Sequence, residues 1–176
     1  MQKHILFCFL FFTIFIFNTN SQAFDFEDYS ETPEKWKSMT NTNIAKSIEQ
    51  QLIDFAKKYL GTPYKYAGKT PAGFDCSGFA GFVFKEFGVT LPASSREIAQ
   101  IGENIDKKDL KIGDLVFFEG RNHTKTVGHV GIVSEINDND VYFIHAAVWS
   151  GGIIISGMKE EYYASRYLKA KRVKII

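Results

Sequence analysis

The chain has 176 residues, of which 21 are basic and 20 acidic, so its formal net charge near neutral pH is +1. This balance leaves no basic surface for nucleic acid, and no nucleic-acid partner is expected. Its two cysteines, Cys8 and Cys76, are too few for a disulfide scaffold.

The first 23 residues have the pattern of a signal peptide. A short basic start, "MQKH", precedes the apolar run "ILFCFLFFTIFIF", which is too short to span a bilayer comfortably. Ser21 and Ala23 then occupy the small-x-small positions that precede a cleavage site. We therefore predict cleavage after Ala23, export to a periplasm or to the exterior, and no stable membrane insertion of the mature chain. An uncleaved membrane anchor is the alternative.

Cleavage would remove Cys8 and leave Cys76 as the sole cysteine of about 150 remaining residues, enough for one domain. A lone thiol in an oxidising compartment is buried and inert, paired with another molecule, or kept for its reactivity. Residues 24–43 show neither helical nor strand periodicity and are interpreted as an N-terminal extension, followed by a domain over 44–176.

Two helices are predicted at the start of this domain. Apolar residues recur at helical spacing in "NIAKSIEQQLIDFAKKYLG", which predicts a helix over 44–60 that ends at Gly61. The next stretch, "TPYKYAGKTPAGFD", has the prolines and glycines of a loop and leads to Cys76. A second helix is predicted from Ser77 to Phe87, closed by Gly88.

After a loop and a short helix in "VTLPASSREIAQIGENI", the pattern changes to short apolar runs separated by turn residues. These runs are "GDLVFFEG", "GHVGIVSEI", "DVYFIHAAV", "GGIIISGM" and "YLKAKRVKII". The residues "NDND" over 137–140 are typical of a turn between two of them. Helices followed by consecutive strands indicate an α+β domain, with N-terminal helices packed on an antiparallel sheet of about five to six strands.

Two of the remaining histidines fall in predicted strands. His129 opens "HVGIV", and His145 alternates with Val141 and Phe143 on one side of its strand. If the "NDND" turn joins these strands in a hairpin, both histidines lie on one face, and we expect the helix at Cys76 to pack on that face. His123 lies in a polar loop and is expected to be solvated.

This grouping favours nucleophilic catalysis by a thiol. A helix N-terminus and an adjacent imidazole both lower the pKa of a thiol, so a low pKa is expected for Cys76. Cys76 would attack, His129 would act as base and then as acid, and His145 would hold the His129 ring. The backbone amide of Cys76 and a nearby hydroxyl would bind the oxyanion. The alternative readings are a small buried cysteine and two hydrogen-bonded core histidines.

The motifs "GTPYKYAG", "FDCSGFAGFVFKEFGVTLPASS", "LKIGDLVFFEG", "GHVGIV" and "FIHAA" come in the order and spacing of the NlpC/p60 family of bacterial cell-wall cysteine endopeptidases, which the chain resembles. The resemblance implies a papain-like fold. It also implies that Cys76 cleaves amide bonds of peptidoglycan peptides, at γ-D-glutamyl or diamino-acid linkages, with His129 as base and His145 as third residue. No cofactor or metal is implied.

By the same resemblance, Tyr64 is the tyrosine near the nucleophile, and Asp75 and Ser77 contact the substrate. Either of the latter two would alternatively cap the helix. The chain departs from the family pattern at three positions in the substrate-binding region: Tyr66, Ala67 and Ala93. The stretch "RNHTKTVG" before His129 is longer than the usual loop and is expected to form a wall of the cleft.

Three other functions remain open from the residues. A thiol amidase or acyltransferase acting on another cell-envelope substrate would use the same Cys/His chemistry. A zinc site would use Cys76, His129 and His145 as ligands with water in the fourth position. A non-catalytic module would bind the cell wall without cleaving it. The sequence does not predict an oligomeric state.

Overall fold

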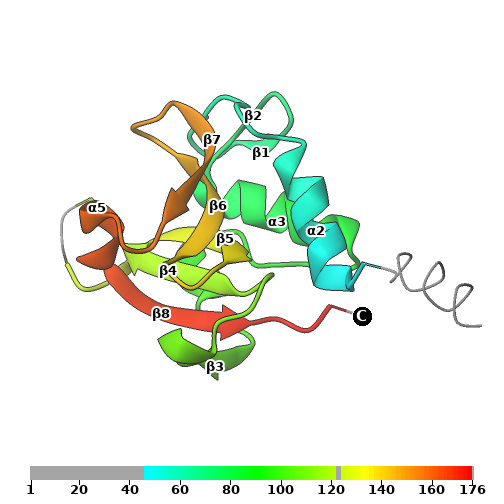
Figure 1. Ribbon diagram of the computed structural model, residues 1–176. Helices are drawn as coiled ribbons and strands as arrows, with labels where there is room; N and C mark the ends of the chain where they lie inside the picture. The colour runs from blue at the N-terminus through cyan, green and yellow to red at the C-terminus, as the bar shows by residue number, and fades with distance from the viewer. Residues whose placement is uncertain (1–45, 122–123, 176) are drawn as a thin grey trace, which may run out of the picture. The chain divides into compact units, whose positions relative to one another are not determined.

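The computed structural model describes residues 46–121 and 124–175 (Figure 1). The predicted signal peptide, the predicted extension over 24–43, and His123 lie outside these residues. Within the described part of the chain, no helix has the length and apolar character needed to cross a membrane.

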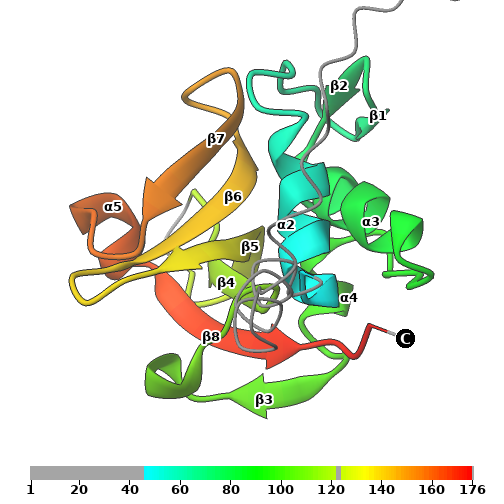
Figure 2. The same ribbon diagram turned by 45° about the vertical axis from the view of Figure 1, so that its right-hand side comes forward.

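The domain is built on a six-stranded sheet with the strand order β3-β8-β4-β5-β6-β7, and every neighbouring pair is antiparallel. Figure 2 shows the sheet from β3 at one edge to β7 at the other. The predicted "NDND" turn joins β5 to β6, with the Asn137 side chain accepting hydrogen bonds from the backbone N–H groups of Asn139 and Asp140. The strands are β3 (Glu103–Ile105), β4 (Leu115–Glu119), β5 (Val127–Ile136), β6 (Val141–Ala147), β7 (Gly152–Gly157) and β8 (Tyr167–Arg172).

Two helices, α2 (Ile48–Lys57) and α3 (Cys76–Glu86), lie side by side against the sheet (Figures 1 and 2). The Ser47 hydroxyl caps α2 by accepting a hydrogen bond from the N–H of Gln50. Between the helices, β1 (Lys69–Thr70) and β2 (Gly73–Phe74) form a small hairpin. The remaining elements are α4 (Ser95–Ile98), the 3-10 turn η1 (Lys107–Asp109) and α5 (Glu161–Ala164).

The predicted α+β class and the antiparallel sheet are confirmed, and all five predicted strands are present. The first helix is shorter than predicted, because the chain leaves the α-helix at Lys57 and continues in tighter turns to Gly61. The second begins one residue earlier than predicted, at Cys76. The hairpin β1–β2, the strand β3 and the helix α5 were not predicted. Each has at most four residues, too few for a periodic pattern.

The sheet is covered on both faces, by two separate hydrophobic clusters. The larger cluster joins α2 and α3 to one face, which carries Val130, Ile132, Ile144 and Ala146. The smaller cluster covers the opposite face and contains Phe118, Phe143 and Tyr163, the last contributed by α5. The clusters fix which face each strand residue occupies.

The two histidines lie on the face opposite α3, which corrects the expectation that the cysteine helix packs on their face. His129 pairs across the ladder with Phe118 of the smaller cluster, and cross-strand partners share a face. The His145 ring lies 4.7 Å from Phe143 and 5.3 Å from Tyr163, centroid to centroid. The predicted alternation of His145 with Phe143 is therefore right, but the helices pack on the other side of the strand.

Candidate active site

Cys76 is the first residue of α3, and its position is fixed by the helix cap. The Oδ1 atom of Asp75 accepts hydrogen bonds from the N–H of Gly78 at 2.6 Å and from the hydroxyl of Ser77 at 3.0 Å. A Cβ on Gly78 would stand 2.0 Å from the carbonyl oxygen of Gly68, so glycine is needed where the preceding loop crosses the helix. The thiol is thereby held at the positive end of α3.

His129 and His145 form a hydrogen-bonded pair. The Nε2 atom of His129 lies 2.9 Å from the Nδ1 atom of His145, and the rings are nearly perpendicular, at 84°. His145 is completely buried, whereas His129 is partly exposed. The bond occupies one nitrogen of His129 and leaves Nδ1 as its other ring nitrogen.

Tyr163 continues this series of polar groups and was not among the predicted site residues. Its hydroxyl lies 3.4 Å from Nε2 of His145 and also forms a hydrogen bond with the side chain of Ser156. Both Tyr163 and Ser156 are buried. The sequence contains no signal for this role, because Tyr163 stands in a four-residue helix between two strands and belongs to none of the quoted motifs.

The Cys76 sulfur reaches the backbone of β5 at the residue next to His129. Hydrogen bonds from the backbone at Val130, Ser77 and Cys76 itself act on the Cys76 sulfur, and Val130 is the residue after His129. Among the described residues, no direct hydrogen bond joins the thiol to the His129 ring. The Cys76 thiol and His129 thus occupy neighbouring positions along β5 without a hydrogen bond between their side chains.

The thiol and the two imidazoles are uncharged near neutral pH, contrary to the expectation of a low thiol pKa. Burial, followed by the negative charge of Asp75, raises the pKa of Cys76 to about 11. Burial lowers the pKa of His129 to about 4. It also lowers the pKa of His145 well below the usual value, with the charge of His129 as a second cause. The backbone hydrogen bonds from Val130, Ser77 and Cys76 favour the thiolate, but the loss of solvation outweighs them.

Tyr64 is brought close to the thiol, as the family pattern implied. Its pKa is raised first by burial and then by the negative charges of Cys76 and Asp75, which shows that its hydroxyl lies near both. Its backbone is held from two sides. The N–H of Tyr64 donates to the carbonyl of Gly151 at 2.7 Å, and Tyr64 forms a parallel bridge with Phe74.

Asp75 is the cap of α3, whereas Ser77 only donates to the Asp75 carboxylate, so the capping alternative applies to Asp75. Capping occupies one carboxylate oxygen and leaves a substrate role for the other as a prediction. The zinc-site alternative has no support in the geometry, because the described residues contain no group of three or more His, Cys, Asp or Glu side chains arranged to hold a metal ion.

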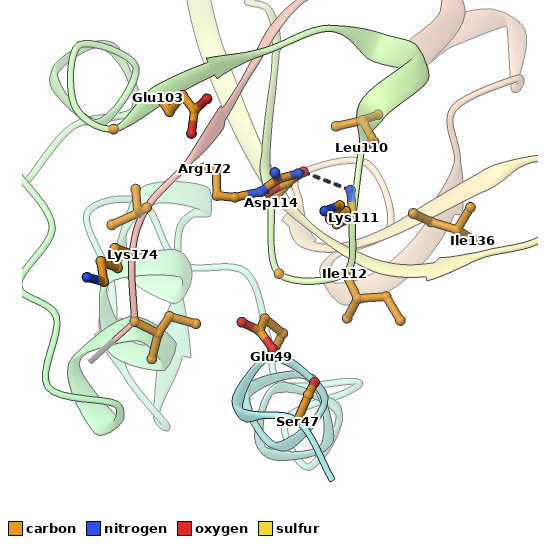
Figure 3. Close-up of a pocket in the computed structure, with 14 residues that line it drawn as sticks. Ser47, Glu49, Glu103, Leu110, Lys111, Ile112, Asp114, Ile136, Arg172 and Lys174 are labelled. Atoms are coloured by element: carbon orange, nitrogen blue, oxygen red, sulfur yellow. Dashed lines mark hydrogen bonds and ion pairs between the residues drawn. The ribbon is translucent and has the colours of Figure 1, made fainter.

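A pocket of about 980 Å³ opens far from these residues, beside the start of α2 and the end of β8 (Figure 3). Its wall includes Asp114, whose carboxylate accepts from the backbone N–H of Lys111 and pairs with the guanidinium of Arg172. None of the predicted site residues lines it. The candidate active site is therefore the region around Cys76 and His129.

A cysteine at the start of a helix that packs on an antiparallel sheet, with a histidine pair on two of its strands, defines the papain-like class of fold. The NlpC/P60 family profile matches residues 61–172, and the chain belongs to this family. The resemblance stated from the motifs is thereby confirmed.

Two curated relatives illustrate the range of the family. The chain is 39% identical over 127 residues to a murein DD-endopeptidase/murein LD-carboxypeptidase of Escherichia coli, covering 72% of this chain and 63% of the relative. It is 32% identical over 133 residues to a γ-D-glutamyl-L-lysine dipeptidyl-peptidase of Bacillus cereus, covering 76% and 39%. The chain thus spans less than two thirds of either relative.

Solved structures show the same fold. An NlpC/P60 family protein from Bacillus cereus superimposes with a TM-score of 0.63 at 34% identity, over 70% of this chain and 39% of that protein. The NlpC/p60 domain of the peptidoglycan hydrolase SagA superimposes with a TM-score of 0.59 at 27% identity, over 71% and 98%. The papain-like fold predicted from the motifs is confirmed.

Proposed function

We propose that this chain is an exported cysteine peptidase that hydrolyses amide bonds in peptidoglycan peptides, with Cys76 as nucleophile, His129 as base and His145 as the residue that holds His129. The observation that carries the proposal is the contact of the Cys76 sulfur, at the start of α3, with the β5 backbone at the residue next to His129, in a member of the NlpC/P60 family. The names of the two relatives, a murein endopeptidase and a γ-D-glutamyl-L-lysine peptidase, support the substrate class.

The uncharged thiol and imidazoles favour attack assisted by a general base over attack by a preformed thiolate. His129 is uncharged at every pH well above 4, so its Nδ1 atom is available to accept a proton. As the Cys76 sulfur bonds to the substrate carbonyl carbon, its proton passes to His129. The carbonyl oxygen becomes an oxyanion, which the backbone N–H of Cys76 and the hydroxyl of Tyr64 would stabilise.

Release of the amine completes the first half of the reaction. The C–N bond breaks, the leaving nitrogen takes the proton back from His129, and an acyl thioester remains on Cys76. Water then loses a proton to His129 and attacks the thioester. Cys76 leaves with that proton and a carboxylic acid is released.

The mechanism needs one particular set of tautomers, which the buried hydrogen bonds allow. If Nδ1 of His129 is to accept a proton, its Nε2 must carry hydrogen and donate to Nδ1 of His145. Nε2 of His145 then carries the hydrogen and donates to the oxygen of Tyr163, which also accepts a hydrogen bond from the Ser156 hydroxyl. Tyr163 acts as a positioning residue in this account, because it fixes His145 and touches no reacting atom.

We assign the scissile bond to the γ-D-glutamyl–diamino acid linkage, on the likeness to the γ-D-glutamyl-L-lysine peptidase. Mass spectrometry of defined peptidoglycan peptides incubated with the purified protein tests this assignment. The expected products are a new amine and a new carboxylic acid at that bond, absent with Cys76→Ala and His129→Ala variants that fold as the wild type does. Intact peptides from the wild-type protein would contradict the proposal, and an acyl group moved to an added amine would indicate an acyltransferase.

A further inference from the structure

A small pocket of about 100 Å³ lies on the histidine face of the sheet, with His129 in its wall. It is separate from the thiol, because neither Cys76 nor Tyr64 lines it. The wall is completed by the loop after β4, the end of β6 and the helix α5, which contribute Arg121, Trp149 and Tyr162. Of the longer loop predicted to form a wall of the cleft, residues 121 and 128 line this pocket.

Two exposed side chains form the mouth of the pocket and pack on each other. Trp149 is 76% exposed. The guanidinium of Arg121 lies 5.2 Å from the centre of the Trp149 ring, within the range of a cation–π contact. A guanidinium carries a planar fork of N–H donors whose geometry matches a carboxylate.

The charged side chains of the wall are Arg121 and Glu119. A second guanidinium, that of Arg166, lies 3.8 Å over the ring of Tyr162 but is not part of the wall. Glu119 and Arg166 both take part in further interactions. Arg121 is therefore the cation of the pocket, and it lies beside the rings of Trp149 and Tyr162.

The chemistry of the proposed reaction says which part of a substrate reaches this pocket. His129 returns its proton to the leaving amine, so that amine must lie against the His129 ring. The acyl part of the substrate stays bonded to Cys76, on the side of Tyr64 and the α3 N-terminus. The pocket that contains His129 but not Cys76 thus lies on the side of the leaving group.

We propose that this pocket binds the leaving amino acid of the substrate and that Arg121, which lies over the Trp149 ring, recognises its free α-carboxylate. The inference rests on the proposed function and deepens it. Its consequence is selectivity for bonds whose amine belongs to a residue with a free α-carboxyl group, and discrimination against the same residue when it is amidated or extended by a further peptide bond.

The test uses two peptides that contain the same γ-D-glutamyl-L-lysine bond and differ only at the lysine α-carboxyl, which is free in one and a carboxamide in the other. We expect the wild-type protein to show a kcat/KM on the order of tenfold higher for the free carboxylate. The Arg121→Gln variant should lower this ratio to near one. Lys125→Gln is the matched control, since it removes the same charge from the same loop at a residue that does not line the pocket, and it should keep the wild-type ratio.

Binding separates a failure of the pocket from a failure of the proposed reaction. Dissociation constants of both peptides are measured by calorimetry in the Cys76→Ala protein, with and without Arg121→Gln. Preference for the free carboxylate that depends on Arg121, in a wild-type protein that cleaves neither peptide, would retain the pocket and reject the peptidase. Equal dissociation constants, no measurable binding of the free-carboxyl peptide, or an equal loss of preference in Lys125→Gln would overturn the pocket assignment.

Discussion

At the scale of single residues, the site is governed by burial. Removal of solvent raises the pKa of Cys76 to about 11 and lowers that of His129 to about 4, so thiol and imidazole are both neutral between these values. The helix N-terminus alone predicts the opposite shift for the thiol. The thiol of the free protein would consequently be unreactive, and it would attack only when a substrate carbonyl is bound beside it.

This neutral state predicts the pH dependence of alkylation. Below its pKa, a thiol gains about tenfold in thiolate fraction for each pH unit. The rate of Cys76 alkylation by iodoacetamide in the free protein should therefore rise about tenfold per unit from pH 7 to pH 10. The His129→Gln variant should follow the same profile, because burial is the main cause. A rate that is already level below pH 8 would instead indicate a preformed thiolate–imidazolium pair.

Tyr163 allows a second prediction at this scale. Tyr163→Phe keeps the ring packing on Phe118 and Phe143 but removes the hydroxyl that lies 3.4 Å from His145. We expect kcat to fall about fivefold to tenfold with KM nearly unchanged, and nitrogen NMR to show a mixture of imidazole tautomers. Tyr167→Phe, in the same hydrophobic cluster, is the control and should change neither. A single tautomer in Tyr163→Phe would argue against the positioning role.

At the scale of elements, short-range signals in the sequence were sufficient for the two long helices and the five strands β4 to β8, and insufficient for the site. The predicted helix at Cys76 is present, because a cap residue, a helical run and a closing glycine are all local. The choice of face for His145 is not local. β6 is buried on both faces, with Phe143 and Ile144 equally inaccessible, so alternation pairs the residues correctly without showing which side the helices cover.

The cap of α3 gives a prediction with a matched pair of variants. Asp75→Ala removes the side chain that accepts from the N–H of Gly78, and should lower the free energy of unfolding by about 1 kcal/mol. Asp75→Asn keeps a capping oxygen and should cost much less. Denaturant unfolding measures both. If Asp75 also binds the free amine of the substrate, KM should rise in both variants. If KM rises only in the destabilised Asp75→Ala variant, the role of Asp75 is limited to capping the helix.

Backbone conformation at two positions gives predictions of opposite sign. Ala67, where the family commonly has glycine, lies in the left-handed region with φ of 57°, and Gly88 closes α3 with φ of 78°. A side chain in this region costs about 1 kcal/mol. Ala67→Gly removes this cost but gives the unfolded chain more conformational freedom, which offsets part of the gain. The free energy of unfolding should therefore rise by about 0.5 kcal/mol. Gly88→Ala should lower it by about 1 kcal/mol. Thermal unfolding measures both variants. Midpoint temperatures that shift in the same direction in the two variants would refute this reasoning.

At the scale of the whole molecule, the candidate active site around Cys76 and His129 and the ion pair between Asp114 and Arg172 lie in separate regions. Arg172 of β8 makes two hydrogen bonds of 2.7 Å to the carboxylate of Asp114, which is 1% exposed and precedes β4. This ion pair joins segments 58 residues apart, and it lies in the wall of the large pocket that contains no site residue. Stability and catalysis should therefore respond to different substitutions.

Asp114→Ala tests that separation. It leaves the N–H of Lys111 without its acceptor and the Arg172 guanidinium with only the carbonyl of Asp109, and should lower the free energy of unfolding by about 3 kcal/mol. The activity of the folded fraction at low temperature should be unchanged. The exposed ion pair between Lys46 and Asp54 is the control, and Asp54→Ala should have a much smaller effect on unfolding. Loss of activity in Asp114→Ala protein that is still folded would show that the two regions are coupled.

The most direct test of the central claim is the mass of the intact protein, measured after acid quenching of a reaction with a γ-D-glutamyl-L-lysine peptide. The account predicts an added mass equal to the acyl half of the peptide, located to the fragment that contains Cys76 and absent from Cys76→Ala. Cleavage of the peptide by Cys76→Ala, without any adduct in the wild type, would contradict nucleophilic attack by this thiol.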